Sequence, residues 1–527
     1  MASFSRIKST LLEKSFLYVL LIGIFIRLYN SYFTFYINSD GVLYINQAKM
    51  IYYNRFDLLS SSGLPNLSNY PFLIAGAFTV LRDWLLAAKS VSFFFGSLTL
   101  APVYLLFRRF FSIYVSSLGT LIYALMPALV SRSADVIRDP IYWFFLASGI
   151  YLLSFYNAKQ PRLYLILSCL SFLLATWARV EAFLFVGVSS LFLLAMGPRR
   201  LLKAFYFLLP VVVIAVIFNV SPVLFKQDLS ALSRLSDFAD RFTLPLENYQ
   251  ALGDDIEDLK NKIPLSKPQL REFLPKAGNF AWLIALFTII NHFLESFFYP
   301  FCLVLLIGIK GSMQRIKAEP FSVCLLIMII AGCLLLLGHL FTFWNFDARF
   351  LVLVIIPIFI FTGYGLDRSM RYMKNKFDRQ ELSAYVIIFC LILMIGLPKN
   401  LYFREKDKLV FKQIGTYVAS REQHNPAYIS ILAYSPYRQI PFYANYSKPE
   451  LILPQLAFLQ EVTGNRCEDL FSHLQKSKTN YFLWEEKFWR SQPYSLTQCI
   501  NRNHLEELNR WHHSDTGQMI LYKVKVQ

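Results

Sequence analysis

The chain has 527 residues, of which 56% are hydrophobic, 17% aromatic and only 16% charged. Soluble globular proteins carry about 25% charged residues, so this composition excludes that class and indicates a protein that crosses a membrane many times. The formal net charge of +18 could suggest a nucleic-acid partner. The Lys and Arg residues are instead clustered in short segments between apolar runs, which is typical of cytoplasmic loops and argues against nucleic acid.

The N-terminal region leads into the first of several long apolar runs. Arg6, Lys8 and Lys14 precede this run and no small-residue cleavage site follows it, which predicts a retained first span rather than a signal peptide. Crossing the hydrocarbon core takes roughly 20 apolar residues. By this measure we expect eleven spans, near residues 12–32, 86–107, 113–131, 137–156, 162–178, 181–196, 202–220, 297–309, 321–343, 350–366 and 384–400.

Basic residues mark alternate connections between these spans. Cytoplasmic loops carry an excess of Lys and Arg, so the pattern predicts a cytoplasmic N-terminus. It also requires that the apolar run from Phe280 to Ile290 does not cross, and we assign that run to an interfacial helix. The basic residues that we expect on the cytoplasmic side are Arg108 and Arg109; Lys159 and Arg162; Arg199, Arg200 and Lys203; Lys310, Arg315 and Lys317; and Arg368, Arg371, Lys374 and Lys376.

The opposite connections carry charges of both signs. Carboxylates and arginines at membrane depth are costly, and they usually pair with one another or mark a functional site. We therefore predict that these connections line one shared pocket on the outer face. They contain Asp40, Lys49 and Arg55; Arg132, Asp135, Arg138 and Asp139; Arg179 and Glu181; the long loop 221–279; and Asp347 and Arg349.

The composition changes after Lys399, where the chain becomes polar and strand-like runs alternate with helix-like stretches. This alternation predicts a small α/β domain outside the membrane. Its strands are expected at 428–433, 451–453, 480–484 and 519–524, and its helices at 409–421 and 467–476.

The expected architecture is therefore a mostly α-helical transmembrane bundle over 1–400, with outer loops 33–85 and 221–296, followed by an extracytoplasmic α/β domain over 401–527. Cys467 and Cys499 are the only cysteines of that last segment. Because disulfides form in oxidising compartments outside the cytoplasm, we also expect these two residues to form one.

A carboxylate stands directly after the first span, in the sequence INSDGVLYINQAK. Asp40 and Tyr44 are four residues apart, which places them on one face of a helix. Asp40 is either the N-cap of an interfacial helix or a general base that takes a proton from an acceptor hydroxyl. The two roles are compatible, and the residues alone leave both open.

Charged residues also precede the span that begins near residue 137. In SRSADVIRDPIYW, Pro140 suits the first turn of a helix and Asp139 suits the positive N-terminal end of that helix. Arg132 and Arg138 carry guanidinium groups, which are favoured ligands for phosphate. This stretch therefore has a structural interpretation for Asp139 and a binding interpretation for the two arginines.

Three further arginines lie near the outer boundary. In TWARVEAF, Arg179 and Glu181 form either a structural ion pair in a tight turn or part of the predicted pocket. Arg27 in the first span and Arg349 at the start of the tenth are placed either to reach the membrane interface with their long side chains or to bind an anion.

Other polar groups carry weaker signals. His292 and Glu295 are either site residues or packing residues, and no set of ligands with metal spacing surrounds them. The acidic cluster 254–258 is typical of a solvated loop, and Asn66 and Asn445 lie in N-x-S sequons. No D-x-D, Walker or Rossmann signature is present in the sequence, which argues against nucleotide-driven chemistry.

In order and spacing, these motifs resemble the GT-C superfamily of integral-membrane glycosyltransferases. The nearest branch contains lipid A aminoarabinose transferase, protein O-mannosyltransferases and related bacterial transferases that use polyprenyl-phosphate sugars. The residues that carry the resemblance are Arg27 followed by Asp40, Tyr44 and Ala48; Tyr70 and Pro71 in NYPFLIAGAF; Asp139 in RDPIYWFF; Arg179 and Glu181 in RVEAF; and Arg349 and Pro357 in ARFLVLVIIPIF.

The resemblance implies that Asp40 is the catalytic base, that Asp139 or Asp135 is a second acid of the site, and that Arg349 belongs to the donor-phosphate region. Many relatives have a second acid where this chain has Gly41, which weakens the case for a metal site; we name no metal ligand and no cofactor, and metal dependence stays open. With the charges described above, the expected donor-phosphate ligands are Arg349, Arg138, Arg27 and Arg179, and the expected substrate contacts are Tyr44, Glu181, His292 and Glu295.

The implied reaction moves a hexosyl or pentosyl group, with inversion, from a polyprenyl monophosphate to a hydroxyl or amine of a lipid, glycan or protein acceptor. The resemblance places it on the outer face of a bacterial inner membrane. A transporter or flippase of lipid-linked saccharides is an alternative, although transporters place their charges near the midplane and often contain internal repeats, which we do not detect. A polymerase of lipid-linked repeat units remains open.

The alternation of basic loops generates a test of topology. We expect a cysteine introduced at Lys374 to react with a membrane-impermeant thiol reagent only after the membrane is opened, because its loop is predicted to be cytoplasmic. A cysteine introduced in 401–527 should react in intact cells. Reaction at position 374 from the outside alone would contradict the predicted orientation.

Overall fold

The computed structural model describes residues 14–61, 67–196, 198–225, 235–264, 266–376, 380–402, 406–433, 437–454, 467–489 and 504–525. The chain separates into two compact units. We call the first, formed by 1–31, 92–134 and 138–401, the helical unit. We call the second, formed by 32–91, 135–137 and 402–527, the mixed unit.

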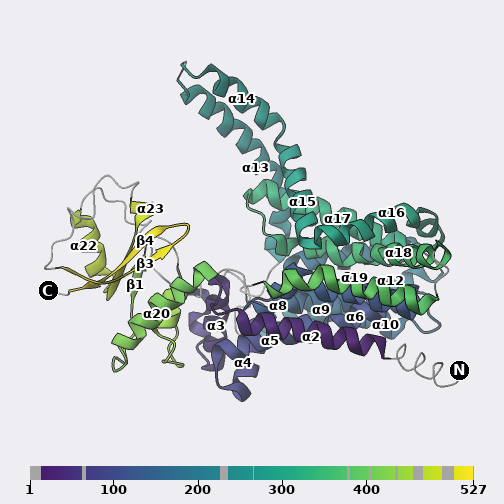
Figure 1. The fold of residues 1–527 in the computed structure, drawn as a ribbon, viewed down its shortest axis with the longest axis horizontal. Coiled ribbons are helices and arrows are strands. Elements are labelled where there is room, and N and C mark those ends of the chain that lie inside the picture. Colours follow the sequence, from purple (N-terminus) through teal and green to yellow (C-terminus); the bar gives the residue numbers. More distant parts are fainter. Residues whose placement is uncertain are drawn as a thin grey trace. The chain divides into compact units, whose positions relative to one another are not determined.

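The helical unit is built from apolar helices, which Figure 1 shows in purple to green. Each predicted span falls on such a helix, which confirms the predicted fold class. The helices are α2 (Ser15–Phe33), α6 (Leu100–Phe110), α7 (Ile113–Leu125), α8 (Pro127–Ala134), α9 (Asp139–Leu153), α10 (Arg162–Ala178), α11 (Phe183–Ala195), α12 (Arg200–Phe225), α13 (Leu235–Lys262), α14 (Pro268–Asn279), α15 (Ala281–Phe297), α16 (Tyr299–Ala318), α17 (Pro320–Phe343), α18 (Val352–Lys376) and α19 (Glu381–Leu401).

Judged by helix length and composition, the structure contains fewer candidate membrane spans than the eleven expected from the sequence. Within the described residues, six helices are long and apolar enough to cross a membrane, or up to eight if each of two bent helix pairs is one span. Further apolar helices have only 10–17 residues. The count of eleven therefore stays a prediction, as does the interfacial assignment of the run that begins α15.

A bend between α7 and α8 directs the chain toward the charged residues. The two helices meet at 57°. Pro127 begins α8 and cannot donate a backbone hydrogen bond, and the residue before a proline avoids the helical conformation. Met126 is accordingly extended, with ψ of 115°. The bend ends one helix and starts the next, which carries Arg132 in its last turn.

The predicted long outer loop is largely helical. The acidic residues of the cluster 254–258 lie on α13, not on a loop, although they are exposed as expected. The segment is amphipathic, and α13 packs against both α14 and α17. Apolar residues of α13 such as Leu252 and Ile256 are partly buried, and this amphipathic pattern favours a helix in a sequence that its acidic residues made resemble a loop.

Helices α16 and α18 approach each other closely at two glycines. A Cβ atom added at Gly308 would overlap the carbonyl oxygen of Phe361, and one added at Gly365 would overlap the carbonyl oxygen of Val304. Small residues allow two helix backbones to meet in this way inside a membrane. The pair of glycines therefore sets the separation of these two helices.

The C-terminal part of the mixed unit contains a four-stranded sheet with the order β1-β2-β4-β3. β1 is parallel to β2, and the remaining pairs are antiparallel, with Leu483 opposite Leu521. The strands are β1 (Ile431–Ala433), β2 (Tyr481–Glu485), β3 (Leu505–His513) and β4 (Gly517–Val524), and the helices are α20 (Leu409–Arg421), α21 (Gln439–Ala444), α22 (Cys467–Lys476) and α23 (Glu486–Trp489).

The sheet has two apolar faces because alternate side chains of a strand point to opposite sides. Tyr481 and Leu483 of β2 pack with residues of α20 and α21, whereas Phe482 packs with Leu470 and Leu474 of α22. Each face of the sheet is thus covered by different helices. Two short 3-10 helices, η1 (Phe56–Ser61) and η5 (Lys406–Lys408), complete this unit together with the N-terminal helices described next.

Residues 32–91 of the mixed unit form helices where an outer loop was expected. They are α3 (Ser39–Tyr52), α4 (Asn69–Leu81) and the start of α5 (Trp84–Leu98). The predicted strand 451–453 is wrong. Its backbone is bound by side chains of α3 instead: Asn46 exchanges two hydrogen bonds of 2.8 Å with the backbone of Leu453, and Lys49 Nζ donates to the carbonyl of Leu451 over 2.9 Å.

The other predicted elements of the C-terminal segment agree with the structure. β3, whose sequence is mostly polar, was missed, as were the short helices α21 and α23. The predicted disulfide lies outside the described residues because Cys499 is not among them. Asn66 also lies outside them. Asn445 is 3% exposed and its amide forms hydrogen bonds with both the N–H and the carbonyl of Ile429. In this structure the sequon at Asn445 is therefore not accessible to a glycan.

A glycine-to-alanine substitution, which adds one methyl group, tests the contact between α16 and α18. We expect Gly308→Ala to lower the free energy of unfolding by about 1–3 kcal/mol or more, because backbone atoms cannot move aside as a side chain can. Gly187→Ala on α11 is the matched control, since a Cβ atom there meets nothing within 4 Å. Thermal unfolding of both variants in detergent measures the difference, and equal melting temperatures would contradict the close approach.

Candidate functional site

Three buried charges form the centre of a polar cluster in the helical unit. Arg179 Nη1 lies 2.5 Å from Asp139 Oδ1, and its Nη2 lies 3.5 Å from Glu181 Oε1. The side chains of Arg179 and Asp139 are 4% and 1% exposed. The predicted ion pair of Arg179 and Glu181 is thus confirmed, and it includes a third partner that is 40 positions away in the sequence.

Local sequence positions each member of this triad. Asp139 is the first residue of α9 and Pro140 follows it in the first turn, as predicted. Arg179 ends α10 in an extended conformation, with φ of −144°. The 3-10 helix η2 (Val180–Ala182) follows directly and carries Glu181. The end of one helix therefore supplies the cation, and the start of another supplies the anion that the helix dipole favours there.

A second group of charges lies around Asp347, just before the 3-10 helix η4 (Ala348–Leu351). Asp347 Oδ1 accepts from Arg132 Nη2 and from the backbone N–H of Arg349, both over 3.0 Å. Arg349 Nε lies 3.3 Å from Asp347 Oδ2. The side chains of Arg132 and Arg349 are 32% and 25% exposed, so this group is more accessible than the triad.

One aromatic ring connects the two groups. The guanidinium carbon of Arg179 lies 4.5 Å from the ring centre of Phe350, and that of Arg349 lies 5.7 Å from it. Arg349 and Arg138 are also close enough to Asp139 to act on its charge. Three of the connections predicted to share a pocket therefore meet within the helical unit. Together they contain four arginines, which are Arg132, Arg138, Arg179 and Arg349, against three carboxylates, which are Asp139, Glu181 and Asp347.

Two polar groups in the first turn of α9 have no protein partner. Within the described residues, the hydroxyl of Tyr142 and the indole N–H of Trp143 are buried without a hydrogen bond. Tyr142 is close enough to Arg179, Glu181 and Asp139 to sense their charges. A buried polar group without a partner costs about 1–3 kcal/mol. Sequence reasoning missed Tyr142, because its motif reads as an ordinary apolar helix start.

Asp40 lies in the mixed unit, in the first turn of α3. The N-cap interpretation of Asp40 is wrong. Asn38 is the cap, since its side-chain oxygen accepts from the N–H of Gly41 over 2.5 Å. Asp40 is half-buried at the positive end of the helix dipole. A Cβ atom at position 41 would lie 2.8 Å from both Asn38 Oδ1 and Val136 Cβ, which explains why this chain has glycine there in place of a second acid.

The other predicted residues of the mixed unit have neighbours within that unit, and their roles in a site stay predictions. Tyr44 is 4% exposed, and its ring meets that of Tyr70 edge-on, with centres 5.3 Å apart. Tyr70 donates to the carbonyl of Ala88 over 2.9 Å. Asp135 is half-buried and acts electrostatically on Lys89. Asp135 therefore belongs to the mixed unit and Asp139 to the triad of the helical unit, although only four positions separate them.

Arg27 does not reach a membrane interface. It is fully buried, and Nη1 donates to the carbonyls of Gly23 and Ala124 over 3.1 and 3.2 Å. The snorkelling interpretation is wrong, because neighbouring helices of the unit surround this side chain. Its binding of an anion stays a prediction.

His292 and Glu295 face each other on α15 at 4.0 Å. The imidazole of His292 lies against the ring of Phe346, with centres 5.4 Å apart, and Glu295 is 66% exposed. Their role as substrate contacts stays a prediction. Over the described ranges, no three His, Cys, Asp or Glu side chains are grouped to hold a metal ion.

The triad generates a stability test. Arg179→Gln leaves two buried carboxylates without a cation, whereas Asp139→Asn leaves the pair of Arg179 and Glu181 intact. We expect Arg179→Gln to cost about 3–5 kcal/mol and Asp139→Asn to cost less. Arg371→Gln, in a pair with Asp367 whose arginine is 59% exposed, is the control and should cost at most about 1 kcal/mol. Unfolding in detergent measures all three, and equal losses for the two arginine variants would contradict the arrangement.

Part of the chain matches a known protein family, and its fold matches that of solved structures. Residues 69–225 match the family model described as dolichyl-phosphate-mannose-protein mannosyltransferase. No curated protein matches the chain by sequence.

Solved structures match over nearly the whole chain. The archaeal oligosaccharyltransferase AglB from Archaeoglobus fulgidus, in complex with an inhibitory peptide and a dolichol-phosphate, aligns with a TM-score of 0.56 and 12% identity over 97% of this chain and 74% of its own. ArnT from Cupriavidus metallidurans bound to undecaprenyl phosphate aligns with a TM-score of 0.55 and 11% identity over 97% of this chain and 98% of its own.

In the apo state, ArnT aligns with a TM-score of 0.56 over 100% of both chains. At 11–12% identity these structures establish the fold alone. The matched segment and this fold confirm the resemblance that the motifs predicted: the chain is an integral membrane protein that resembles the GT-C superfamily of glycosyltransferases, in particular ArnT and the protein mannosyltransferases.

Proposed function

We propose that the protein is a glycosyltransferase that moves a sugar from a polyprenyl-phosphate donor to an acceptor on the outer face of the membrane. The observation that carries this proposal is the group of four arginines around Asp139 and Asp347, at the ends of apolar helices of the helical unit. Support comes from the matched family, which is named for a dolichyl-phosphate sugar, and from the structures of AglB and ArnT with lipid phosphates.

The arginines divide into two roles in this proposal. Arg179 is buried between two carboxylates, so it holds the start of α9 and the end of α10 in place. Arg349 and Arg138 are partly accessible and are the ligands of the donor phosphate. Guanidinium groups match phosphate oxygens in geometry, and a cation fixed in advance stabilises the charge that grows on the departing lipid phosphate.

The unpartnered hydroxyl of Tyr142 fits the same interpretation. It lies in the first turn of α9, next to the triad, and it can donate to an oxygen of the donor. A bound phosphate or sugar hydroxyl would remove the cost of leaving this group unsatisfied. Glu181 and Asp139 neutralise Arg179, so the positive charge that remains for the donor is supplied by Arg349, Arg138 and Arg132.

Asp40 is the general base in this proposal. As a carboxylate it removes a proton from the acceptor hydroxyl or amine as that atom attacks the sugar carbon, and the bond from that carbon to the phosphate oxygen breaks on the opposite side. The sugar thus inverts, the proton moves to Asp40 and the electron pair leaves with the lipid phosphate. The acceptor is a lipid, a glycan or a protein, and the transferred group is a hexose or a pentose.

Variants of Asp40 and Arg349 test these assignments. Asp40→Asn keeps the size of the side chain but cannot accept the proton, so we expect the rate to fall by about 100-fold to 10,000-fold. Arg349→Ala should weaken donor binding as well as turnover, because a phosphate ligand acts on both the bound donor and the leaving group. The measurement is sugar transfer by purified, monodisperse protein from synthetic polyprenyl-phosphate donors.

Asp57→Asn is the matched control for the loss of a carboxylate. Asp57 is 62% exposed and pairs with Arg55 over 3.0 Å, so its loss should leave the rate unchanged. If Asp40→Asn retains a near wild-type rate, Asp40 is not the base. If the wild-type protein moves intact lipid-linked sugar across vesicles without transferring it, the protein is a transporter and the proposal fails.

A further inference from the structure

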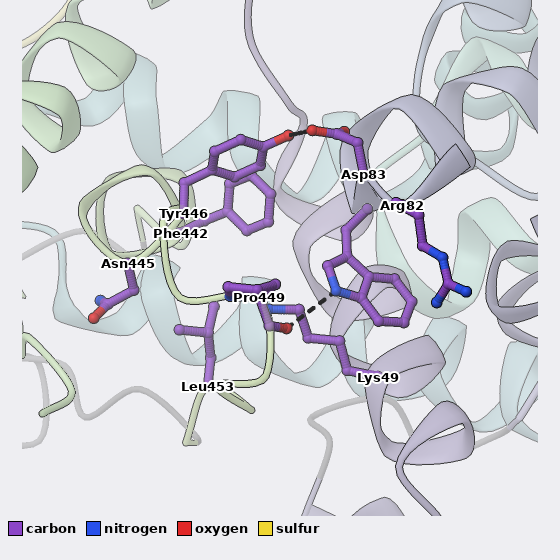
Figure 2. Close-up of a pocket in the computed structure, with 9 residues that line it drawn as sticks. Lys49, Arg82, Asp83, Phe442, Asn445, Tyr446, Pro449 and Leu453 are labelled. Atoms are coloured by element: carbon purple, nitrogen blue, oxygen red, sulfur yellow. Dashed lines mark hydrogen bonds between the residues drawn. The ribbon is translucent and has the colours of Figure 1, made fainter. Parts of the chain in front are cut away.

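A cavity of about 140 Å³ lies within the mixed unit. Figure 2 shows its lining, which comes from helix α3, from the turn between α4 and α5 with the first residue of α5, and from α21 and the segment that follows it. Drug-sized ligands occupy pockets of roughly 300–1,000 Å³, so this cavity suits a single ring or headgroup. Its main lining residues are Lys49, Asp83, Trp84, Phe442, Tyr446 and Pro449.

Lys49 is the unusual member of this set. It is 8% exposed, and burial lowers the pKa of its ammonium group to about 8. Nζ donates to the carbonyl of Leu451 over 2.9 Å and lies 5.9 Å from the ring centre of Trp84. No carboxylate within the described residues forms an ion pair with Lys49. An ammonium group has three N–H donors, and a buried cation without an anion is costly.

Asp83, the acidic residue that lines the cavity, already accepts hydrogen bonds from other groups. Asp83 Oδ1 accepts from the N–H of Leu86 over 2.7 Å, and Oδ2 accepts from the hydroxyl of Tyr446 over 2.6 Å, which Figure 2 marks with a dashed line. Asp83 therefore caps the start of α5 and holds Tyr446. It does not neutralise Lys49.

The aromatic wall is rigid. Trp84 stacks on Phe78 with ring centres 3.7 Å apart, and its indole N–H donates to the carbonyl of Pro449 over 3.1 Å. Phe442 and Tyr446 lie together, with centres 5.5 Å apart. Arg82, at the rim, is exposed and donates to the hydroxyl of Tyr52 over 3.1 Å. The charged lining residues thus comprise two cations and one anion that already has partners.

We propose that this cavity binds a sugar-sized anion, a monosaccharide or headgroup that bears a phosphate or a carboxylate. The acidic group pairs with the ammonium of Lys49, and the apolar face of the ring lies against the aromatic and proline side chains. Such pockets combine an apolar lining with a few placed polar groups. The proposal does not depend on the proposed transferase activity, since it concerns binding alone.

The ligand would also connect two distant parts of the sequence. Lys49 and Trp84 come from residues 32–91, whereas Phe442, Tyr446 and Pro449 come from the C-terminal segment of the same unit. A ligand that binds only the folded state adds stability that grows with its concentration. Occupation of the cavity should therefore raise the melting temperature of the protein.

Chemical labelling of the full-length protein in detergent tests the site directly. The probes are glucose 6-phosphate and glucuronate. Glucose, which lacks an acidic group, and inorganic phosphate, which lacks a sugar ring, are the controls. We expect both acidic sugars to slow acetylation of Lys49 by about tenfold at saturation, as quantified by mass spectrometry. Acetylation of Lys476, an exposed lysine on α22, is the internal reference and should not change.

Calorimetric titration of variants provides the second measurement. We expect Lys49→Gln to weaken binding of glucose 6-phosphate by about tenfold or more, since a charge-assisted hydrogen bond is lost. Lys49→Arg should retain part of the affinity, and Lys476→Gln should retain all of it. Labelling of the wild-type protein keeps the test valid if Lys49→Gln does not fold.

Three results would overturn the proposal. Glucose protecting Lys49 as well as the acidic sugars do would show that no anion is recognised. Inorganic phosphate protecting as well as glucose 6-phosphate would show that the ring is not recognised. The absence of protection by any probe would show that the cavity does not bind this class of ligand.

Discussion

Arg179 is the interaction on which the charged region of the helical unit depends. An arginine at this depth is stable only with anions around it, because the cost of removing an ion from water reaches several kcal/mol. Asp139 and Glu181 supply these anions, one from the start of α9 and one from η2. The ring of Phe350 lies over the same guanidinium and links it to the segment that carries Arg349. One buried cation thus joins three parts of the chain.

This arrangement divides the charges into a buried group and a more accessible group. The triad is almost closed to solvent, whereas Arg132, Asp347 and Arg349 are a quarter to a third exposed. In the function proposed above, the donor phosphate binds the second group without breaking the first. Preorganised cations of this kind need no rearrangement as charge develops on a leaving group, which is why electrostatic stabilisation is often the largest single contribution to catalysis.

The mixed unit uses polar side chains in another way. Asn46 and Lys49 of α3 bind the backbone of 451–453, Asn445 binds the backbone of Ile429, and Tyr446 binds Asp83. These bonds replace strand pairing at the positions where the chain runs as an extended loop, since buried backbone groups must find partners. Lys49 differs from the others because it is a cation whose hydrogen-bond partner, the carbonyl of Leu451, is neutral. That difference makes the cavity beside it a candidate site.

Local sequence determined most of the secondary structure. The apolar runs specify the helices of a membrane protein because only apolar side chains tolerate lipid, and Pro140 with Asp139 marks the start of α9 because proline and a carboxylate suit that position in any helix. Short continuous apolar runs in 480–484 and 519–524 likewise specify β2 and β4, whose two faces are both covered. Only part of the triad could be predicted from the sequence. Arg179 and Glu181 are two positions apart and suggest an ion pair, whereas Asp139 is 40 positions from Arg179.

Long-range packing decided the rest. Asn38 caps α3 in place of Asp40 because the helix begins two residues earlier than the charge suggests. Arg27 and Asn445 resemble exposed polar residues in sequence, yet both are buried because neighbouring elements supply carbonyl and amide partners. The grouping of 32–91 with 402–527 in one unit, the loss of the expected strand at 451–453 and the cavity beside Lys49 all arise from contacts between segments hundreds of residues apart. No local pattern encodes such contacts, because each depends on the surface that the other segment presents.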